Sequence, residues 1–220
     1  MKAEYYQLPV ELMGKTIAKM DVSNLQVYGN FLAQTYYYVS HSTRMLAFGA
    51  GLMKRSEENH FRRFIKHISE ESSHEVLAER DLQDLGMKPT DFYHLPETHA
   101  LWEPQYYKML HEGPLSLMGY IIALEYFSCT HLPAVYKRIQ DTHGTKAGRF
   151  IKLHAEEDPD HIQKAIELTS TLSPDLQETI LVNIVQTAKT YSLMVDTCIQ
   201  SATIDTSRTF TEFREREFIA

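Results

Sequence analysis

Apolar and aromatic residues recur along this chain at spacings of three and four, the pattern of helices that bury one face. No segment alternates convincingly between apolar and polar positions, as a half-buried strand would. Glycine and proline are sparse, with nine and eight among 220 residues, so long intervals remain for helices. The pattern predicts an all-α chain of about seven helices in a single domain over residues 1–220, with a core from about 23 to 203 and a C-terminal tail over 204–220.

Turn-forming and capping residues divide this pattern into separate helices. Gly49 and Gly51 are expected to end the first helix, and Gly86 the second. Ser173-Pro174 is typical of an N-cap followed by the first helical residue, and it starts the last long helix. The predicted helices cover about residues 23–48, 56–85, 97–111, 114–141, 146–172 and 173–202.

Composition and charge narrow the classes of function. A net charge of −7, with Lys and Arg scattered along the chain, argues against a nucleic-acid partner, which would need a basic face. No run of about eighteen apolar residues occurs, so we expect no membrane-spanning helix and no membrane partner. Cys129 and Cys198 form no disulfide framework or metal motif, and the N-terminus lacks the apolar core of a signal peptide. The expected setting is the cytoplasm.

Acidic and imidazole groups share one face of the helix predicted over residues 56–85. Glu71 and His74 have the Glu-x-x-His spacing by which helical bundles supply two ligands to iron. Glu70 and His67 occupy neighbouring positions and are alternative ligands from the same helix. The other interpretation is a solvated polar face, because acidic helices contain this spacing often.

Glu125 is the only acidic residue between Gly113 and Asp141, inside the helix predicted to be the most buried. An ionised carboxylate in such surroundings costs several kcal/mol unless a cation or hydrogen bonds compensate it. This favours a functional role for Glu125. The alternatives are an exposed helix edge or a buried ion pair with a basic residue such as Lys137.

A third motif lies in the segment His154-Ala-Glu-Glu-Asp158-Pro-Asp-His161. On a continuous helix, Asp158 and His161 would lie at about 40° and −20° from His154, so all three would share one stripe. Two imidazoles and a carboxylate on one side are typical of a non-haem iron site. However, Asp158-Pro159 is also an excellent N-cap followed by proline at the first helical position. A helix that begins at Pro159 would break the stripe.

The three motifs together supply three carboxylates and three imidazoles from three helices. Bridging carboxylates offset the repulsion between two metal dications, and vacant coordination positions allow O2 to bind. The set predicts a non-haem iron site with about two Fe(II) ions.

In this order the motifs resemble the haem-oxygenase-like iron oxidases, relatives of thiaminase II, pyrroloquinoline quinone synthase and the chlamydial protein CADD. The likeness covers about residues 25–200, although its specificity rests on few positions. The segments that match best are 65–74 with the following 81–86, then 123–125, and 152–158.

The resemblance implies a seven-helix haem-oxygenase-like bundle whose iron ligands are Glu71, His74, Glu125, His154, Asp158 and His161. The ligand spacing in the first of these helices varies in the family, so His67 or Glu70 remains a substitute, and Pro159 is a departure from the pattern. Fe(II) would be the cofactor and O2 the co-substrate. Known members desaturate, cleave C–C bonds in, or N-oxygenate amino acids and fatty acids, often in natural-product biosynthesis.

The first long helix would line the same cavity and contact a small-molecule substrate. Arg44 and His41 are candidates to hold a substrate carboxylate, Arg44 through a bidentate contact. A surface position at the helix end is the alternative for both. The sequence has no flavin or NAD motif, so an electron donor would be an external partner or the substrate itself. We further expect a homodimer.

Two other functions compete with an iron oxidase. A metal-free relative of thiaminase II would hydrolyse a heterocycle with a cysteine nucleophile, for which Cys129, one turn after Glu125, is the only candidate near the predicted site. Such a hydrolase would have no use for three histidines at ligand spacing. In a non-catalytic helical interaction protein, the same groups would be polar residues on the surface.

Overall fold

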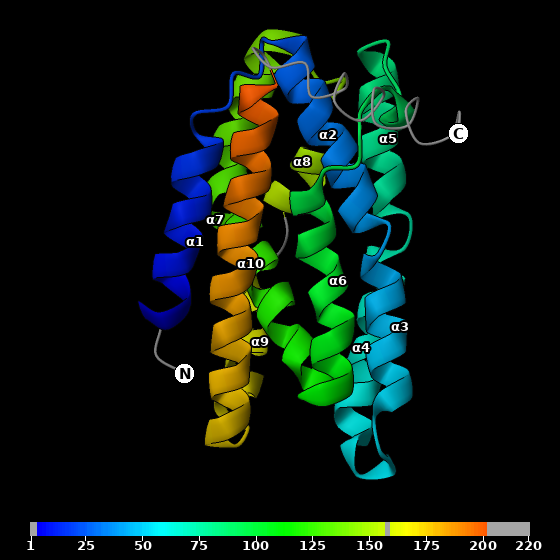
Figure 1. Ribbon diagram of the computed structural model, residues 1–220, viewed down its shortest axis with the longest axis vertical. Coiled ribbons are helices and arrows are strands. Elements are labelled where there is room, and N and C mark those ends of the chain that lie inside the picture. Colours follow the sequence, from blue (N-terminus) through cyan, green and yellow to red (C-terminus); the bar gives the residue numbers. More distant parts are fainter. Residues whose placement is uncertain (1–3, 157–158, 202–220) are drawn as a thin grey trace, which may run out of the picture.

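The computed structural model describes residues 4–156 and 159–201, and every regular element within these ranges is helical (Figure 1). The α-helices are α1 (Glu4–Ile17), α2 (Leu25–Val39), α3 (Ser42–Leu52), α4 (Glu58–Glu71), α5 (His74–Asp84), α6 (Pro96–His111), α7 (Met118–His143), α8 (Arg149–Ala155), α9 (Pro159–Ser170) and α10 (Pro174–Gln200). Short 3-10 turns η1 (Arg55–Glu57), η2 (Pro89–Asp91) and η3 (Pro114–Leu117) precede or join them. The predicted all-α class is confirmed.

Three of the helices that the sequence predicts as continuous are each divided into two helices. The first is divided after Val39, where the Ser40 hydroxyl donates to the carbonyl of Tyr36 at 2.7 Å and competes with the helical pattern. Its second part, α3, continues past Gly49 and Gly51 to Leu52, so these glycines do not end it. Breaks also divide the pairs α4–α5 and α8–α9, and joining each pair restores seven segments in the described part of the chain.

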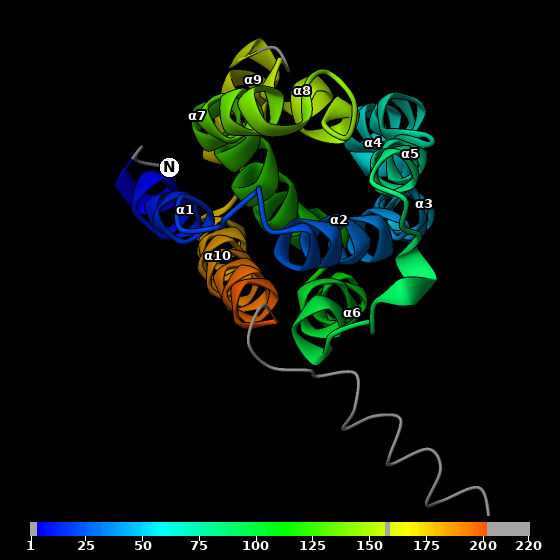
Figure 2. The ribbon, with the colours of Figure 1, turned by 90° about the horizontal axis from the view of Figure 1, so that it is seen from above.

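Helix α1 lies before the first helix that the sequence pattern predicted. It packs along α10 and also contacts α7, with Val10, Met13 and Ile17 buried. The last helix, α10, begins as expected, because the Ser173 hydroxyl accepts a hydrogen bond from the backbone N–H of Leu176. Seen from above, α10 and α6 lie on one side and α8 and α9 on the other, with α7 and α2 between them (Figure 2).

Close packing of α7 on α10 depends on Gly119. A Cβ atom at this position would lie 2.4 Å from the Ile180 carbonyl oxygen, so the two backbones approach only because glycine has no side chain. Beside it, the buried Asn183 amide donates to Gln105 and to the Ser116 carbonyl, each at 2.8 Å. The close approach at Gly119 holds α7 against α10, and the Asn183 hydrogen bonds join α10 to α6 and to η3. Together these contacts fix the position of α7, which carries Glu125.

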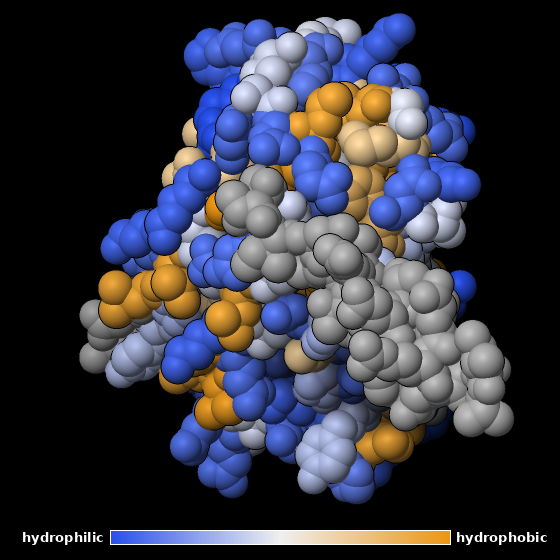
Figure 3. Space-filling view, turned by 45° about the horizontal axis from the view of Figure 1, so that its top comes forward, coloured by the Kyte–Doolittle hydropathy of each residue, from blue (hydrophilic) through white to orange (hydrophobic). Residues whose placement is uncertain are grey.

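On the face drawn in Figure 3, hydrophilic side chains predominate and hydrophobic ones gather in small separate groups. No helix in the described ranges combines the length and the apolar character that crossing a bilayer requires.

Candidate metal centre

Glu71 and His74 lie at a helix break rather than on one continuous helix. Glu71 is the last residue of α4 and His74 the first of α5, so the expected helical geometry of the pair is wrong. Ser73 adopts a left-handed backbone conformation, with φ of 71°, and turns the chain between them. The two side chains nevertheless meet, with His74 Nδ1 3.4 Å from Glu71 Oε2.

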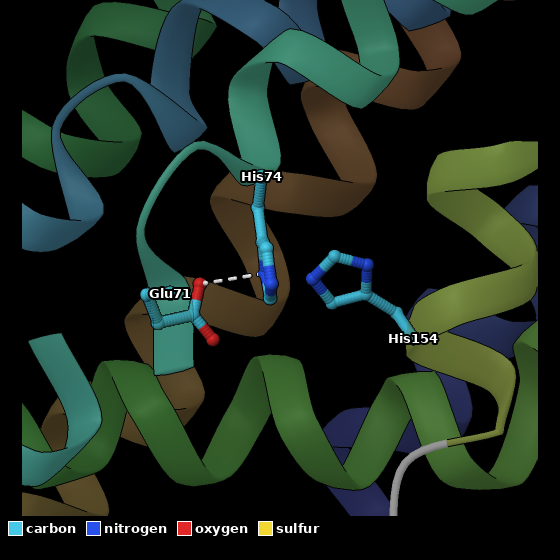
Figure 4. A group of neighbouring side chains, drawn as sticks. All are labelled: Glu71, His74 and His154. Atoms are coloured by element: carbon cyan, nitrogen blue, oxygen red, sulfur yellow. Dashed lines mark ion pairs between the residues drawn. The ribbon is translucent and has the colours of Figure 1, made fainter. Parts of the chain in front are cut away.

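His154 of α8 completes a group of three. One ligand atom each from Glu71, His74 and His154 lies within 4.8 Å of the others, and Figure 4 shows the two imidazole rings pointing toward one another. His154 Nδ1 is 2.8 Å from the Phe150 carbonyl, which can only accept, so Nδ1 carries the proton and Nε2 the lone pair. A neutral imidazole held in one tautomer by a backbone carbonyl is the usual state of a metal ligand.

Asp81 ties the two helices that carry these imidazoles. Its buried carboxylate accepts hydrogen bonds from the backbone N–H groups of Arg149 and Phe150, at 3.0 and 2.9 Å, and from the Arg149 guanidinium at 3.1 Å. Because Asp81 lies on α5 and receives the first N–H groups of α8, it sets the position of His154 relative to His74. Asp81 follows His74 by seven residues, which is two helical turns, so both lie on one face of α5. This spacing is visible in the sequence and could have identified Asp81.

His67 lies between two carboxylates at the centre of the site. Its Nε2 atom is 3.2 Å from Glu125 Oε1 and 3.5 Å from Glu71 Oε1. The Glu125 side chain is only 17% exposed, and its second oxygen is buried without a hydrogen-bond partner in the described residues. His67 therefore connects Glu125 of α7 with the group at the end of α4.

Burial and mutual charge give the groups of this site distinct protonation behaviour. Burial, together with the nearby Glu71 charge, raises the pKa of Glu125 to about 7, against a lowering influence of His67. Burial also acts to raise the pKa of Glu71, but the His67 and His74 imidazoles beside its carboxylate outweigh this effect and hold that pKa well below its usual range. Burial lowers the pKa of His154, which favours the neutral, ligating form.

The site borders two cavities, and His67 and Glu125 line both of them. The inner cavity is bordered by His67, Glu71, Glu125 and His154 on its polar side. Its remaining walls are mostly apolar and aromatic, and come from α2, α3, α7, α8 and α10. Among the described residues, those that line the outer cavity are all polar or charged.

Of the remaining predicted ligands, only Glu70 can be compared with this group in full, and it does not join it. Glu70 is exposed and lies 2.7 Å from Lys66 at the outer cavity, so it does not replace Glu71. Helix α8 ends at Ala155 and α9 begins at Pro159, so the continuous stripe from His154 is wrong and the proline alternative is confirmed. Asp158 and the side chain of His161 lie outside the described residues.

The residues proposed for substrate binding and hydrolysis lie away from the inner cavity. Arg44 is exposed and its guanidinium donates to the Ser40 carbonyl, while the His41 ring stacks on Trp102 with ring centroids 3.6 Å apart. Cys129 is half-buried. None of Arg44, His41 and Cys129 lines either cavity.

Comparison with known proteins agrees with this fold. The sequence matches the family described as iron-containing redox enzymes over residues 29–192, whereas no curated protein matches it. A domain of unknown function with a heme oxygenase-like fold from Shewanella denitrificans is 18% identical, with a TM-score of 0.77 over 89% of this chain and 90% of that one. A TenA homologue from Pseudomonas syringae is 19% identical, with a TM-score of 0.72 over 90% and 89%. A TenA homologue from Pyrococcus furiosus is 12% identical, with a TM-score of 0.63 over 90% and 100%.

Proposed function

This chain belongs to the family of iron-containing redox enzymes and has their haem-oxygenase-like fold, and we propose that it is an O2-dependent non-haem iron oxidase. The observation that carries the proposal is the convergence of Glu71, His74 and His154 on one point. Two imidazoles and one carboxylate are the ligand set of non-haem Fe(II) oxygenases.

The donor atoms suit Fe(II) in detail. His74 Nδ1 is buried without a hydrogen-bond partner in the described residues, and His154 presents Nε2 as its lone-pair nitrogen. An orphaned buried nitrogen such as His74 Nδ1 is costly unless a ligand satisfies it. Glu125, together with Asp158 and His161 as the sequence motif predicts, would supply a second iron, for about two Fe(II) per chain.

Bound Fe(II) would supply the reducing power and the open coordination positions that O2 needs. The protein's own side chains position the substrate and control water and protons. The apolar walls of the inner cavity exclude water from the carbon that is to be oxidised. Before the second iron binds, Glu125, with its pKa near 7, can hold or release a proton beside His67.

We propose a small organic substrate, such as an amino acid or fatty acid derivative, converted in specialised metabolism. The sequence has no flavin or NAD motif, so reducing equivalents beyond those of the substrate come from an external donor.

Anaerobic loading of the full chain with Fe(II), followed by metal analysis, tests the proposal. We expect about two irons per chain, a marked loss in Glu71→Gln and His154→Ala, and O2 consumption by the loaded protein. The matched controls are Glu178→Gln and His111→Ala, at exposed positions of α10 and α6. Iron content equal to that of a protein without a metal site would refute the proposal.

Two further variants separate the alternatives. Iron content unchanged by Asp158→Ala and by His161→Ala would show a mononuclear site instead of a di-iron one. Cys129→Ser should leave activity intact, whereas a thiaminase II-like hydrolase with this nucleophile would lose it.

A further inference from the structure

An aromatic row of five side chains, separate from both cavities, joins α2 and α3 to α6. The His94 ring, just before α6, stacks on Tyr37 of α2 with ring centroids 4.5 Å apart and on His99 of α6 with centroids 3.7 Å apart. At the other end, His41 at the joint between α2 and α3 stacks on Trp102 of α6, with centroids 3.6 Å apart. The rings of His99 and Trp102, 5.6 Å apart, connect the two stacks. Three imidazoles therefore share one row.

The packing of the row suits neutral imidazoles and opposes imidazolium ions. His94 Nε2 and His41 Nδ1 are both buried without a hydrogen-bond partner in the described residues. An imidazolium carries a proton on each nitrogen and needs an acceptor for both. Two imidazolium rings stacked as closely as His94 and His99 would also repel each other.

Charged and titratable groups face the row from four elements. Besides the imidazoles themselves, they are Tyr36 and Tyr37 of α2, Arg44 of α3, Asp91 of η2, and Glu103 and Tyr106 of α6. Asp91 already accepts a hydrogen bond from the backbone N–H of Lys88 at 2.9 Å. Glu103 Oε1 lies 2.9 Å from His99 Nδ1, so Glu103 can compensate one proton in the row. A second proton, at His94 or His41, has no such contact.

Burial and the neighbouring positive charges act in the same direction on two of the imidazoles. Burial, His99 and His41 lower the pKa of His94 to about 4, although Glu103 acts to raise it. Burial, Arg44 and His99 likewise lower the pKa of His41, again against Glu103. The fold therefore favours the neutral rings. This contribution to stability is present above the unperturbed pKa of 6.5 and is lost as the pH falls from there toward about 4.

The row holds a joint that belongs to the wall of the inner cavity. His41 lies between Val39, the last residue of α2, and Ser42, the first of α3, and both of these residues line the inner cavity. Met45 and Leu46 continue the same wall along α3. Because the stack of His41 on Trp102 ties this joint to α6, loss of the stack frees α3 to move away from the cavity.

We propose that the aromatic row is an acid-sensitive latch, closed at neutral pH, which opens the α2–α3 wall of the inner cavity when a second imidazole takes up a proton. That the latch regulates an oxidase rests on the proposed function, whereas its opening requires no iron.

Trp102 is the only tryptophan of the chain, so its fluorescence reports on the latch directly. The full chain without iron is titrated with acid while tryptophan fluorescence, its quenching by acrylamide and the helical circular dichroism are recorded. We expect a reversible transition with a midpoint between about pH 4 and 6.5, at unchanged helix content. Across it, quenching of Trp102 should increase about two-fold or more, as the indole leaves its covered position.

Hydrogen exchange connects the row with the cavity wall. After correction for the intrinsic pH dependence of exchange, the protection of the α3 amides should fall about ten-fold across the transition, while that of α1 stays the same. A fluorescence transition without this loss of protection in α3 would overturn the proposal.

Two exposed residues shift the transition in opposite directions. Glu103→Gln removes the carboxylate that favours protonation, so the midpoint should move to lower pH. Arg44→Gln removes a positive charge beside His41, so the midpoint should move to higher pH. Shifts absent from both variants would assign the transition to groups outside the row and overturn the proposal.

The double variant His41→Phe/His94→Phe keeps stacked rings that cannot take up protons and should show no transition. The matched control His60→Phe/His111→Phe changes two histidines of α4 and α6 outside the row and should behave as the wild type does. A transition that survives in the first variant, or none in the wild type before the helices unfold, would overturn the proposal. A protein that shows the latch but takes up no iron would refute the oxidase function alone.

Discussion

Asp81 of α5 accepts a hydrogen bond from the backbone N–H of Phe150, 2.9 Å away at the start of α8. This contact joins the helix that begins with His74 to the helix that carries His154. The spacing of the two imidazoles, whose ring centroids are 4.9 Å apart, therefore depends on a residue that does not face the metal centre itself.

Asp81→Ala should destabilise the protein and weaken its iron affinity together. The substitution leaves the N–H groups of Arg149 and Phe150 without their acceptor in a buried place, which costs about 2 kcal/mol or more of unfolding free energy. Denaturant unfolding measures the stability, and Fe(II) titration measures the affinity. The control is Asp84→Ala, because Asp84 contacts the same Arg149 guanidinium from an exposed position and should have a smaller effect on both. Equal effects of the two variants would contradict a special role for Asp81.

Ser73 should tolerate glycine and resist a β-branched residue. A left-handed conformation costs an L-residue about 1–2 kcal/mol, which Ser73→Gly relieves, against about 0.5–1 kcal/mol of added chain entropy in the unfolded state. We expect Ser73→Gly to match or exceed the wild-type melting temperature and to keep its iron, and Ser73→Val to lose both stability and iron. A Val variant as stable as the wild type would show that the turn between Glu71 and His74 does not need this conformation.

Gly119→Ala should be strongly destabilising because its Cβ would lie 2.4 Å from the Ile180 carbonyl oxygen. Pushing α7 and α10 apart costs about 2 kcal/mol. Gly51→Ala is the matched comparison, since its Cβ would meet nothing within 4 Å near the end of α3, and it should stabilise the protein by about 0.5 kcal/mol. Thermal unfolding of both variants checks the pair, and a neutral Gly119→Ala would refute the close approach.

Stability and iron binding should depend on pH in opposite senses through Glu125. Its pKa in the iron-free fold is about 7, above the 4.5 of an unperturbed glutamate. The fold therefore favours the protonated form, and this contribution to stability is lost as the pH rises from about 4.5 to 7. Iron requires the ionised carboxylate, so Fe(II) affinity should rise over the same range.

Glu125→Gln removes this titration. Unfolding of the iron-free protein between pH 4.5 and 7 should then vary less with pH than in the wild type. Fe(II) affinity measured in the same buffers should also lose part of its rise. An unchanged pH profile of stability in the variant would assign the dependence to another group.

Much of the fold and part of the site follow from local sequence signals. The helical class, the N-cap at Ser173 and the break at Pro159 depend on interactions within a turn or two of chain, which the sequence displays directly. Glu71, His74, Glu125 and His154 stand out in the same way, because their chemistry is conspicuous in the helices around them.

Tertiary structure alone decided how these groups meet. The helical pattern of apolar residues continues through Ser73, so it gives no sign of the turn that joins Glu71 and His74. His67 contacts Glu71 in its own helix and also Glu125, which follows His67 by 58 residues in the sequence. Asp81 accepts a hydrogen bond from Phe150, which follows it by 69 residues. Arg44 and His41 do not line the cavity for the same kind of reason. Helical periodicity is set by near neighbours, whereas the orientation of one helix toward another is set by contacts between distant segments, which exist only once the bundle is packed.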